Sequence, residues 1–290
     1  MTLELNQILQ VACKGGASDI HLKAGLPPMF RVDGTLLPLR DGARLTPDQL
    51  QRFAGTMMSQ TQRDHFKQQL DCDLAYGVPG VGRFRVNVFQ QRGVIGMVFR
   101  VIPFKIKTCE QLLLPPTVRQ IAEERRGLIL VTGATGSGKS TTLSAMIEHI
   151  NTTRSDHIVT IEDPIEFLIR DKKSIVNQRE IGIDCRGFAP ALRAALRQDP
   201  DVILLGEMRD KETIETALEA AETGHLVLST MHTIDATETV SRLIGVFPPH
   251  QQKHVKSMFA TLMQGVVSQR LVPRVDGRVH GCLGWGVTGL

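Results

Sequence analysis

The chain has 290 residues, of which 42% are hydrophobic and 22% are charged, and its formal net charge is +4. This length suits two domains of ordinary globular composition, and so small and scattered a positive charge argues against a nucleic-acid binder. Apolar runs fall short of the roughly 20 residues that cross a bilayer, and residues 1–5 lack a signal-peptide core, so we expect a cytoplasmic protein without direct membrane insertion.

Short strands separated by turns are predicted in the first hundred residues. The apolar patterns predict strands at 19–22, 29–32 and 83–89. Asp33-Gly34 and Pro79-Gly80 are turn signals between them. A helix is predicted to begin at Thr46, with Pro47 in its first turn and Gln49 completing a capping box. We therefore expect a small α+β domain over residues 1–103.

The next stretch has the features of a connection between domains. Residues 104–114 lie between Pro103 and the pair Pro115-Pro116, and prolines commonly mark such boundaries. We assign 104–114 as a linker and 115–280 as a second domain.

Apolar strands alternate with helical patterns in this second domain. Strands are predicted at 127–132, 157–161, 202–205 and 226–229, and helices at 140–150, 189–198, 211–223 and 236–245. Continuously apolar strands alternating with helices are typical of a parallel sheet that is covered on both faces. The fold class predicted is therefore α/β for the second domain.

A phosphate-binding loop lies between the first of these strands and its helix. The segment from Gly133 to Ser140 reads GATGSGKS and matches the pattern G-x-x-x-x-G-K-[ST]. Glycines allow successive N–H groups to point at phosphate oxygens, and the following helix adds its positive end. Lys139 is expected to reach the β- and γ-phosphates, and Ser140 to bind Mg²⁺. The residues predicted to bind ATP here are Gly133, Ala134, Thr135, Gly136, Ser137, Gly138, Lys139, Ser140 and Thr141.

Acidic residues follow two of the predicted strands. Strand 202–205 leads through Gly206 to Glu207, and strand 157–161 leads to Glu162, Asp163 and Glu166. Ligands of open parallel sheets bind at the carboxyl ends of the strands. We expect Glu207 to act on Mg²⁺ through water, and Glu166 to polarise the attacking water. Glu162 and Asp163 are expected to shape the surroundings of the metal.

Histidines and arginines supply further candidates. His225 and His232 flank strand 226–229, so they could sense the γ-phosphate or be structural. Motor ATPases often complete their site with an arginine from a neighbouring subunit. The candidates are Arg193 and Arg197 before strand 202–205, and Arg85 and Arg100 in the first domain, although an exposed arginine alone more often forms a surface ion pair.

Taken in order, these segments resemble the secretion-ATPase superfamily, and most of all its type IV pilus retraction ATPases. The matching segments are ASDIHL from Ala17, GATGSGKSTT from Gly133, IVTIEDPIEF from Ile158, LRAALRQDPDVILLGEMRD from Leu192 and GHLVLSTMHT from Gly224. The absence of a four-cysteine zinc motif and the segment 244–252 also look like the retraction type.

The resemblance implies a PAS-like first domain and a RecA-like ATPase domain that assemble as a homo-hexameric ring. It implies that ATP and Mg²⁺ bind between the domains, and that the ring drives an inner-membrane platform protein at the base of a pilus used for twitching motility. Matching positions make Glu166 the water-polarising glutamate and Glu207 the Walker-B glutamate. They also make His225 and His232 the His-box pair, and Arg85, Arg100 and Arg193 phosphate-contacting or site-completing arginines.

One segment departs from that family. Residues 281–290 read GCLGWGVTGL, where family members continue into further helices that are associated with retraction. The segment resembles an out-of-frame or shortened end, so coupling to retraction is open. Two alternatives stay open: an ATP-binding fragment without motor function, and a RecA-like nucleic-acid translocase. A single Trp and a single Tyr argue against the stacking surface that a translocase needs.

Overall fold

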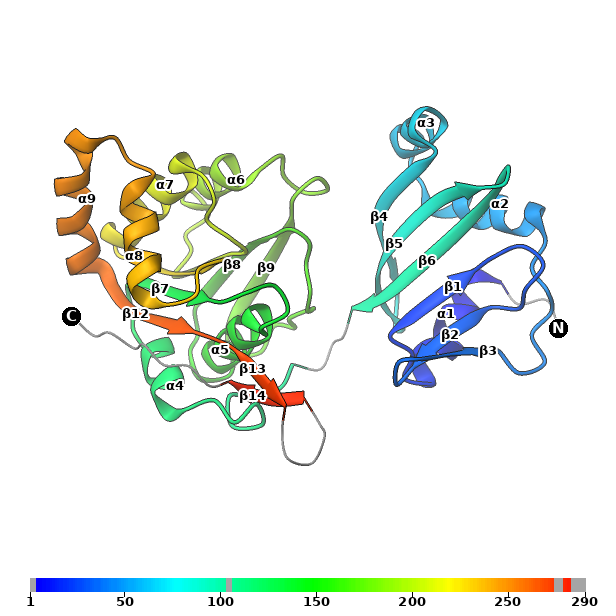
Figure 1. Cartoon of the computed structure of the whole chain (residues 1–290), viewed down its shortest axis with the longest axis horizontal. Coiled ribbons are helices and arrows are strands. Elements are labelled where there is room, and N and C mark those ends of the chain that lie inside the picture. Colours follow the sequence, from blue (N-terminus) through cyan, green and yellow to red (C-terminus); the bar gives the residue numbers. More distant parts are fainter. Residues whose placement is uncertain (1–3, 103–105, 274–278, 283–290) are drawn as a thin grey trace. The chain divides into compact units, whose positions relative to one another are not determined.

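A computed structural model describes residues 4–102, 106–273 and 279–282. The chain divides into two compact units, Met1–Phe104 and Lys105–Leu290, each with its own hydrophobic core (Figure 1). The two units are described separately below.

The first unit is built on a six-stranded antiparallel sheet in the order β3-β2-β1-β6-β5-β4. Its strands are β1 (Asp19–Leu22), β2 (Met29–Val32), β3 (Thr35–Pro38), β4 (Asp71–Val78), β5 (Gly82–Gln91) and β6 (Val94–Ile102). Its helices are α1 (Leu5–Lys14), α2 (Pro47–Met57) and α3 (Gln60–Gln69). Alternation along β5 buries Phe84, Val86 and Val88 beneath the apolar faces of α1 and α2, so one face of the sheet forms the core.

The second unit contains a six-stranded parallel sheet in the order β12-β7-β11-β10-β8-β9. Its strands are β7 (Gly127–Thr132), β8 (His157–Glu162), β9 (Ile175–Glu180), β10 (Val202–Leu205), β11 (Leu226–Met231) and β12 (Met263–Ser268). A two-stranded antiparallel pair, β13 (Leu271–Pro273) and β14 (Val279–Cys282), follows. Every residue of β7, β10 and β11 is buried, as expected for strands covered on both faces.

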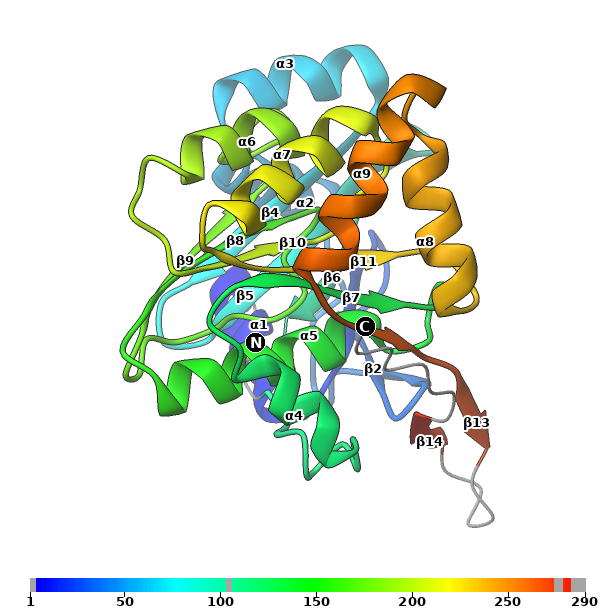
Figure 2. The ribbon, with the colours of Figure 1, turned by 90° about the vertical axis from the view of Figure 1, so that its left-hand side faces the viewer.

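Helices cover both faces of this parallel sheet (Figure 2). On one face lie α6 (Phe188–Ala195), α7 (Lys211–Glu222), α8 (Ala236–Gly245) and α9 (Pro249–Leu262), and on the other lie α4 (Pro116–Ala122) and α5 (Lys139–Thr153). Alternate residues of each strand point to the two cores: Leu128 and Leu130 of β7 pack with the first group, and Ile129 and Val131 pack with the second. The α/β fold predicted from the sequence is confirmed.

Three predicted elements of the first unit were correctly placed, and so was the capping box: the Thr46 hydroxyl accepts from the Gln49 N–H at 3.2 Å. The four strands predicted in the second unit are also present, although β11 continues to Met231. Helix α6 ends at Ala195, short of the predicted 198, because the chain turns towards Asp199, which has a positive φ of 56°.

Most of the predicted linker, residues 106–114, belongs to the second unit. Cys109 and Leu114 are buried in the core of the second unit, beside Val118 of α4. Residues 106–114 therefore pack on that unit, since two apolar side chains at this spacing gain free energy by leaving water. Of the predicted tail, residues 281 and 282 belong to β14, and 283–290 lie outside the described residues.

None of the helices in the described ranges combines the length and apolar character that a membrane crossing requires.

Candidate nucleotide site

The loop between β7 and α5 has the backbone geometry that its glycines predict. Gly136 and Gly138 have φ values of 80° and 90°, which L side chains rarely adopt. A Cβ on Gly133 would come within 2.4 Å of the Gln269 carbonyl oxygen, so that position must also lack a side chain. Helix α5 begins after Gly138 without a side-chain cap, which leaves its first N–H groups available to an anion.

Lys139 is folded back over this loop. It is 8% exposed, and its Nζ donates to the carbonyl oxygens of Gly133 and Ala134 at 2.9 and 3.0 Å. Burial lowers the pKa of Lys139, while the charges of Glu166 and Glu207 raise it in part. The ammonium therefore lies within electrostatic reach of both carboxylates that were predicted from the sequence.

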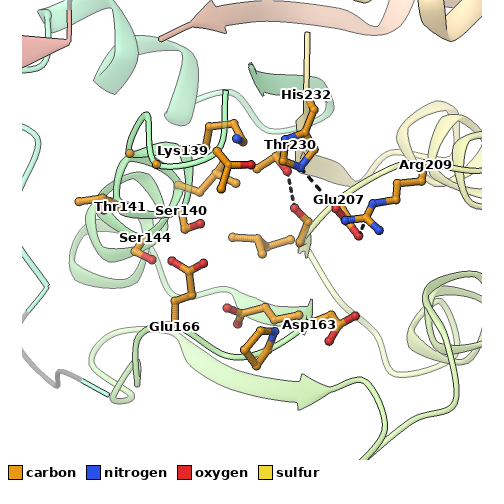
Figure 3. Close-up of a pocket in the computed structure, with 18 of the residues that line it drawn as sticks. Lys139, Ser140, Thr141, Ser144, Asp163, Glu166, Glu207, Arg209, Thr230 and His232 are labelled. Atoms are coloured by element: carbon orange, nitrogen blue, oxygen red, sulfur yellow. Dashed lines mark hydrogen bonds and ion pairs between the residues drawn. The ribbon is translucent and has the colours of Figure 1, made fainter. Parts of the chain in front are cut away.

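The ends of β10 and β11 bring Glu207 and His232 together. A carboxylate oxygen of Glu207 lies 2.7 Å from Nε of Arg209, and the other lies 3.7 Å from Nε2 of His232 (Figure 3). The Thr230 hydroxyl donates to the Gly206 carbonyl oxygen at 2.6 Å and so joins the two strand ends. Burial lowers the pKa of His232, as do the charges of Lys139 and Arg209, whereas Glu207 raises it.

The segment after β8 carries the other acidic residues. Glu162, Asp163 and Glu166 all line the same cavity as Lys139, and the Glu166 carboxylate is directed towards Ser140 (Figure 3). Glu162 differs from the other two because its carboxylate accepts from the Thr160 hydroxyl at 2.6 Å and from Gln178 Nε2 at 3.1 Å. Burial raises the pKa of Glu162, and these bonds lower it in part. Glu162 is thus engaged with the protein while it lines the cavity, and its role in shaping the surroundings of the metal stays a prediction.

These elements enclose a cavity of about 560 Å³ at the carboxyl edge of the parallel sheet. The predicted residues that line it are Thr135, Gly136, Gly138, Lys139, Ser140, Thr141, Glu162, Asp163, Glu166, Glu207 and His232. Gly133, Ala134 and Ser137 lie in the same loop behind this surface, where the first two hold Lys139.

His225 is not brought to the cavity. It precedes β11 at the amino edge of the sheet, where its Nδ1 lies 2.8 Å from the Ala220 carbonyl oxygen and 3.2 Å from the Thr223 hydroxyl. A six-residue strand spans roughly 20 Å, so residues that flank it in sequence lie far apart. Of the two predicted histidines, His232 lines the cavity and His225 does not, and a role of His232 at the phosphates stays a prediction.

The predicted arginines of the second unit, Arg193 and Arg197, lie outside the cavity lining. Arg193 forms an ion pair with Glu212 at 2.6 Å, and Arg197 donates to the Arg193 carbonyl oxygen at 3.0 Å. In the first unit, Arg85 and Arg100 are paired across β5 and β6, and Arg100 Nε lies 3.0 Å from an Asp19 carboxylate oxygen. The ion pairs of Arg193 and Arg100 match the alternative role considered for these residues.

Several residues of the site were not predicted. Arg209 lies two residues after Glu207, Thr230 lies two before His232, and Ser144 lies one helical turn after Ser140; all three line the cavity. Spacing could have found Ser144, because i and i+4 share a face of helix α5. Glu207, Arg209 and His232 lie beyond the ends of β10 and β11, so no strand period links Arg209 or Thr230 to the predicted residues.

The oxygen donors of the cavity suit Mg²⁺, which prefers hydroxyl, carboxylate and phosphate oxygens and keeps several waters. Ser140, Glu207 and Glu166 supply a hydroxyl and two carboxylates. Over the described ranges, His, Cys, Asp and Glu side chains form no group of three that could hold a metal. The Ser140 hydroxyl and the Glu207 carboxylate are of the kinds that would hold Mg²⁺ together with phosphate oxygens and waters.

Comparisons with known proteins place the chain in a family. A family model described as "Type II/IV secretion system protein" matches residues 2–281. The type IV pilus retraction ATPase PilT of Pseudomonas aeruginosa is 49% identical to this chain, and the match covers 95% of this chain and 80% of PilT. The type IV pilus ATPase PilU of the same organism is 40% identical, and that match covers 95% of this chain and 72% of PilU. A crystal structure of the pilus retraction motor PilT with bound ADP superposes with a TM-score of 0.89 and 51% identity, over 97% of this chain and 81% of that one. The chain belongs to the type II/IV secretion system protein family.

Proposed function

We propose that this chain is an ATP-hydrolysing motor subunit that powers retraction of a type IV pilus. The observation that carries the proposal is the gathering of Lys139, Ser140, Glu166 and Glu207 around one cavity at the carboxyl edge of a parallel sheet. The similarity to PilT and PilU supports pilus retraction in place of a nucleic-acid translocase.

In this proposal, the loop amides and Lys139 bind the β- and γ-phosphates, and Ser140 and Glu207 hold Mg²⁺, Glu207 through water. Bound Mg²⁺ neutralises charge on the phosphate oxygens. Glu166 accepts a proton from a water whose oxygen bonds to the γ-phosphorus. The bond from that phosphorus to the β,γ-bridging oxygen breaks, and ADP and phosphate are released. His232 senses the γ-phosphate.

The same proposal includes assembly and location. Six copies form a ring in which Arg85 and Arg100 of the first unit, and Arg193, contribute positive charge to the phosphates. The ring works in the cytoplasm, docked at the inner membrane on the pilus platform protein. Arg193 would have to exchange its ion pair with Glu212 for this role, and such an exposed pair contributes little stability.

Steady-state hydrolysis of Mg·ATP by the purified full chain tests the proposal. We expect turnover that Glu207→Gln reduces at least about 100-fold, and a species much larger than a monomer in size-exclusion chromatography with nucleotide. A monomer without turnover would favour an ATP-binding fragment. Turnover stimulated by single-stranded DNA would favour a translocase.

A further inference from the structure

The segment that carries Glu166 is held by side chains more than by backbone pairing. Among the described residues, the backbone-to-backbone hydrogen bonds include none to residues 163–169, although Ile165 is buried. The backbone N–H and C=O groups of such a loop need other hydrogen-bond partners, and those partners fix the position of the loop. The position of the Glu166 carboxylate therefore depends on what binds this loop from outside.

The Ile165 N–H donates to Glu180 Oε2 at 3.4 Å. Gln178, in β9, supplies two further contacts. Its Oε1 accepts from the Ile169 N–H at 2.8 Å, and its Nε2 donates to the Phe167 carbonyl oxygen at 2.9 Å. The same Nε2 donates to the Glu162 carboxylate at 3.1 Å. A glutamine amide offers two donors and an acceptor, and all three are used within this one loop and the strand that leads into it.

Glu162 completes the arrangement from the neighbouring strand. Gln178 is paired with Thr160 in the parallel register of β8 and β9, so Glu162 lies two residues further along the same face. The Glu162 carboxylate accepts from the Thr160 hydroxyl, and the nearby backbone N–H of Glu166 helps to lower the pKa of Glu162 against the effect of burial. Residues 167 and 169 are thus held by Gln178, which also binds Glu162 beside the backbone of residue 166.

We propose that Gln178, acting with Glu162, is a positioning residue for ATP hydrolysis that holds the loop so that Glu166 faces the attacking water. This inference rests on the proposed function, because it matters only if Glu166 is the water-polarising group. Gln178 itself does not line the cavity. Its effect therefore passes through Glu166 and concerns the chemical step more than nucleotide binding.

The neighbouring residue in β9 provides a matched control. Asn177 is also an amide on this edge strand, but its Nδ2 lies 2.7 Å from Nε2 of His157, and within the described part of the chain it makes no hydrogen bond to the Glu166 loop. Gln178→Met and Asn177→Leu each remove an amide and keep the volume of the side chain. Only the first removes the hydrogen bonds to residues 167 and 169.

Steady-state ATPase kinetics on the full chain provide the test. For Gln178→Met we expect kcat to fall about 10- to 100-fold, as misplacement of a catalytic group by about 1 Å does, while KM for ATP and the affinity for ADP change less than about twofold. Asn177→Leu should match the wild type. If Glu166 carries the effect, adding Gln178→Met to Glu166→Gln should cause no further loss, because residues that act as a unit are not additive.

The outcomes separate this inference from the proposed function. If the wild type does not hydrolyse ATP, or Glu166→Gln is fully active, the proposed function falls and the inference falls with it. If the wild type hydrolyses ATP and Glu166→Gln is impaired, but Gln178→Met keeps the wild-type kcat, only the inference is overturned. The inference is also overturned if the fold losses in kcat of Gln178→Met and Glu166→Gln multiply in the double variant. Gln178→Asn keeps the amide but shortens the side chain by one methylene, so that it falls short of residues 167 and 169, and it serves as the test if Gln178→Met does not fold.

Discussion

The two edges of the parallel sheet use similar side chains for different purposes. At the carboxyl edge, Lys139, Glu207 and His232 surround a cavity and interact with one another across it. At the amino edge, polar side chains bind backbone groups: Asp201 accepts from the His157 N–H at 2.8 Å, and His225 lies beside the Ala220 carbonyl oxygen. Residue type alone therefore does not indicate function, whereas the edge on which a residue lies does.

The reason lies in the connections of a parallel sheet. Each helix returns the chain to the amino edge, where turns leave backbone groups that need partners. Loops that leave the carboxyl edge are free to spread, and the positive end of α5 points there. We expect substitutions at the carboxyl edge to change turnover and substitutions at the amino edge to change stability.

The largest effect is expected from Lys139→Ala. Removing the ammonium deletes a preorganised positive charge at the phosphates, so kcat should fall about 100- to 1,000-fold. Lys173→Ala, an exposed lysine before the amino end of β9, is the control and should leave turnover unchanged. Similar losses in the two variants would contradict the division between the edges.

Glu207→Gln should follow, with a loss in kcat of about 100-fold. The amide keeps an oxygen for the contact with Arg209, so the melting temperature should be close to that of the wild type. Glu215→Gln, on the exposed face of α7, is the matched control. Calorimetry and ATPase assays on the same preparations separate the two effects.

Asn151→Leu tests the amino edge. Asn151 is fully buried at the end of α5, where its Nδ2 donates to the Arg170 carbonyl oxygen at 2.8 Å and its Oδ1 accepts from the Lys172 N–H at 3.1 Å. Leaving these backbone groups without partners should lower the free energy of unfolding by about 1–3 kcal/mol. Denaturant unfolding measures the loss, and the kcat of the folded variant should not change.

The two histidines give the smallest and most direct comparison. His232→Gln should lower kcat about tenfold, the effect of losing one moderate polar contact in a transition state, without a change in stability. His225→Gln should leave kcat unchanged and lower stability by less than about 1 kcal/mol. An equal loss of turnover in both variants would restore the original expectation that both histidines act at the phosphates.

Elements with strong local signals were predictable. The glycines of the phosphate loop, the capping box at Thr46 and the continuous apolar run of β7 each depend on residues within a few positions, and each was correctly placed. The helices α1 and α9 and the edge strand β9 were not predicted. Strand β9 reads Ile-Val-Asn-Gln-Arg-Glu and is recognisable only because β8 pairs with it.

By itself the sequence determined the phosphate loop, the apolar strands that flank it and the acidic residues after β8 and β10, because these depend on local backbone preferences and on contiguous burial. Only the tertiary structure decided that His232 and not His225 reaches the cavity, that Glu162 is engaged with Thr160, and that Gln178 binds the Glu166 loop. Those contacts join segments whose proximity depends on strand order and register, which the packing of both cores sets together.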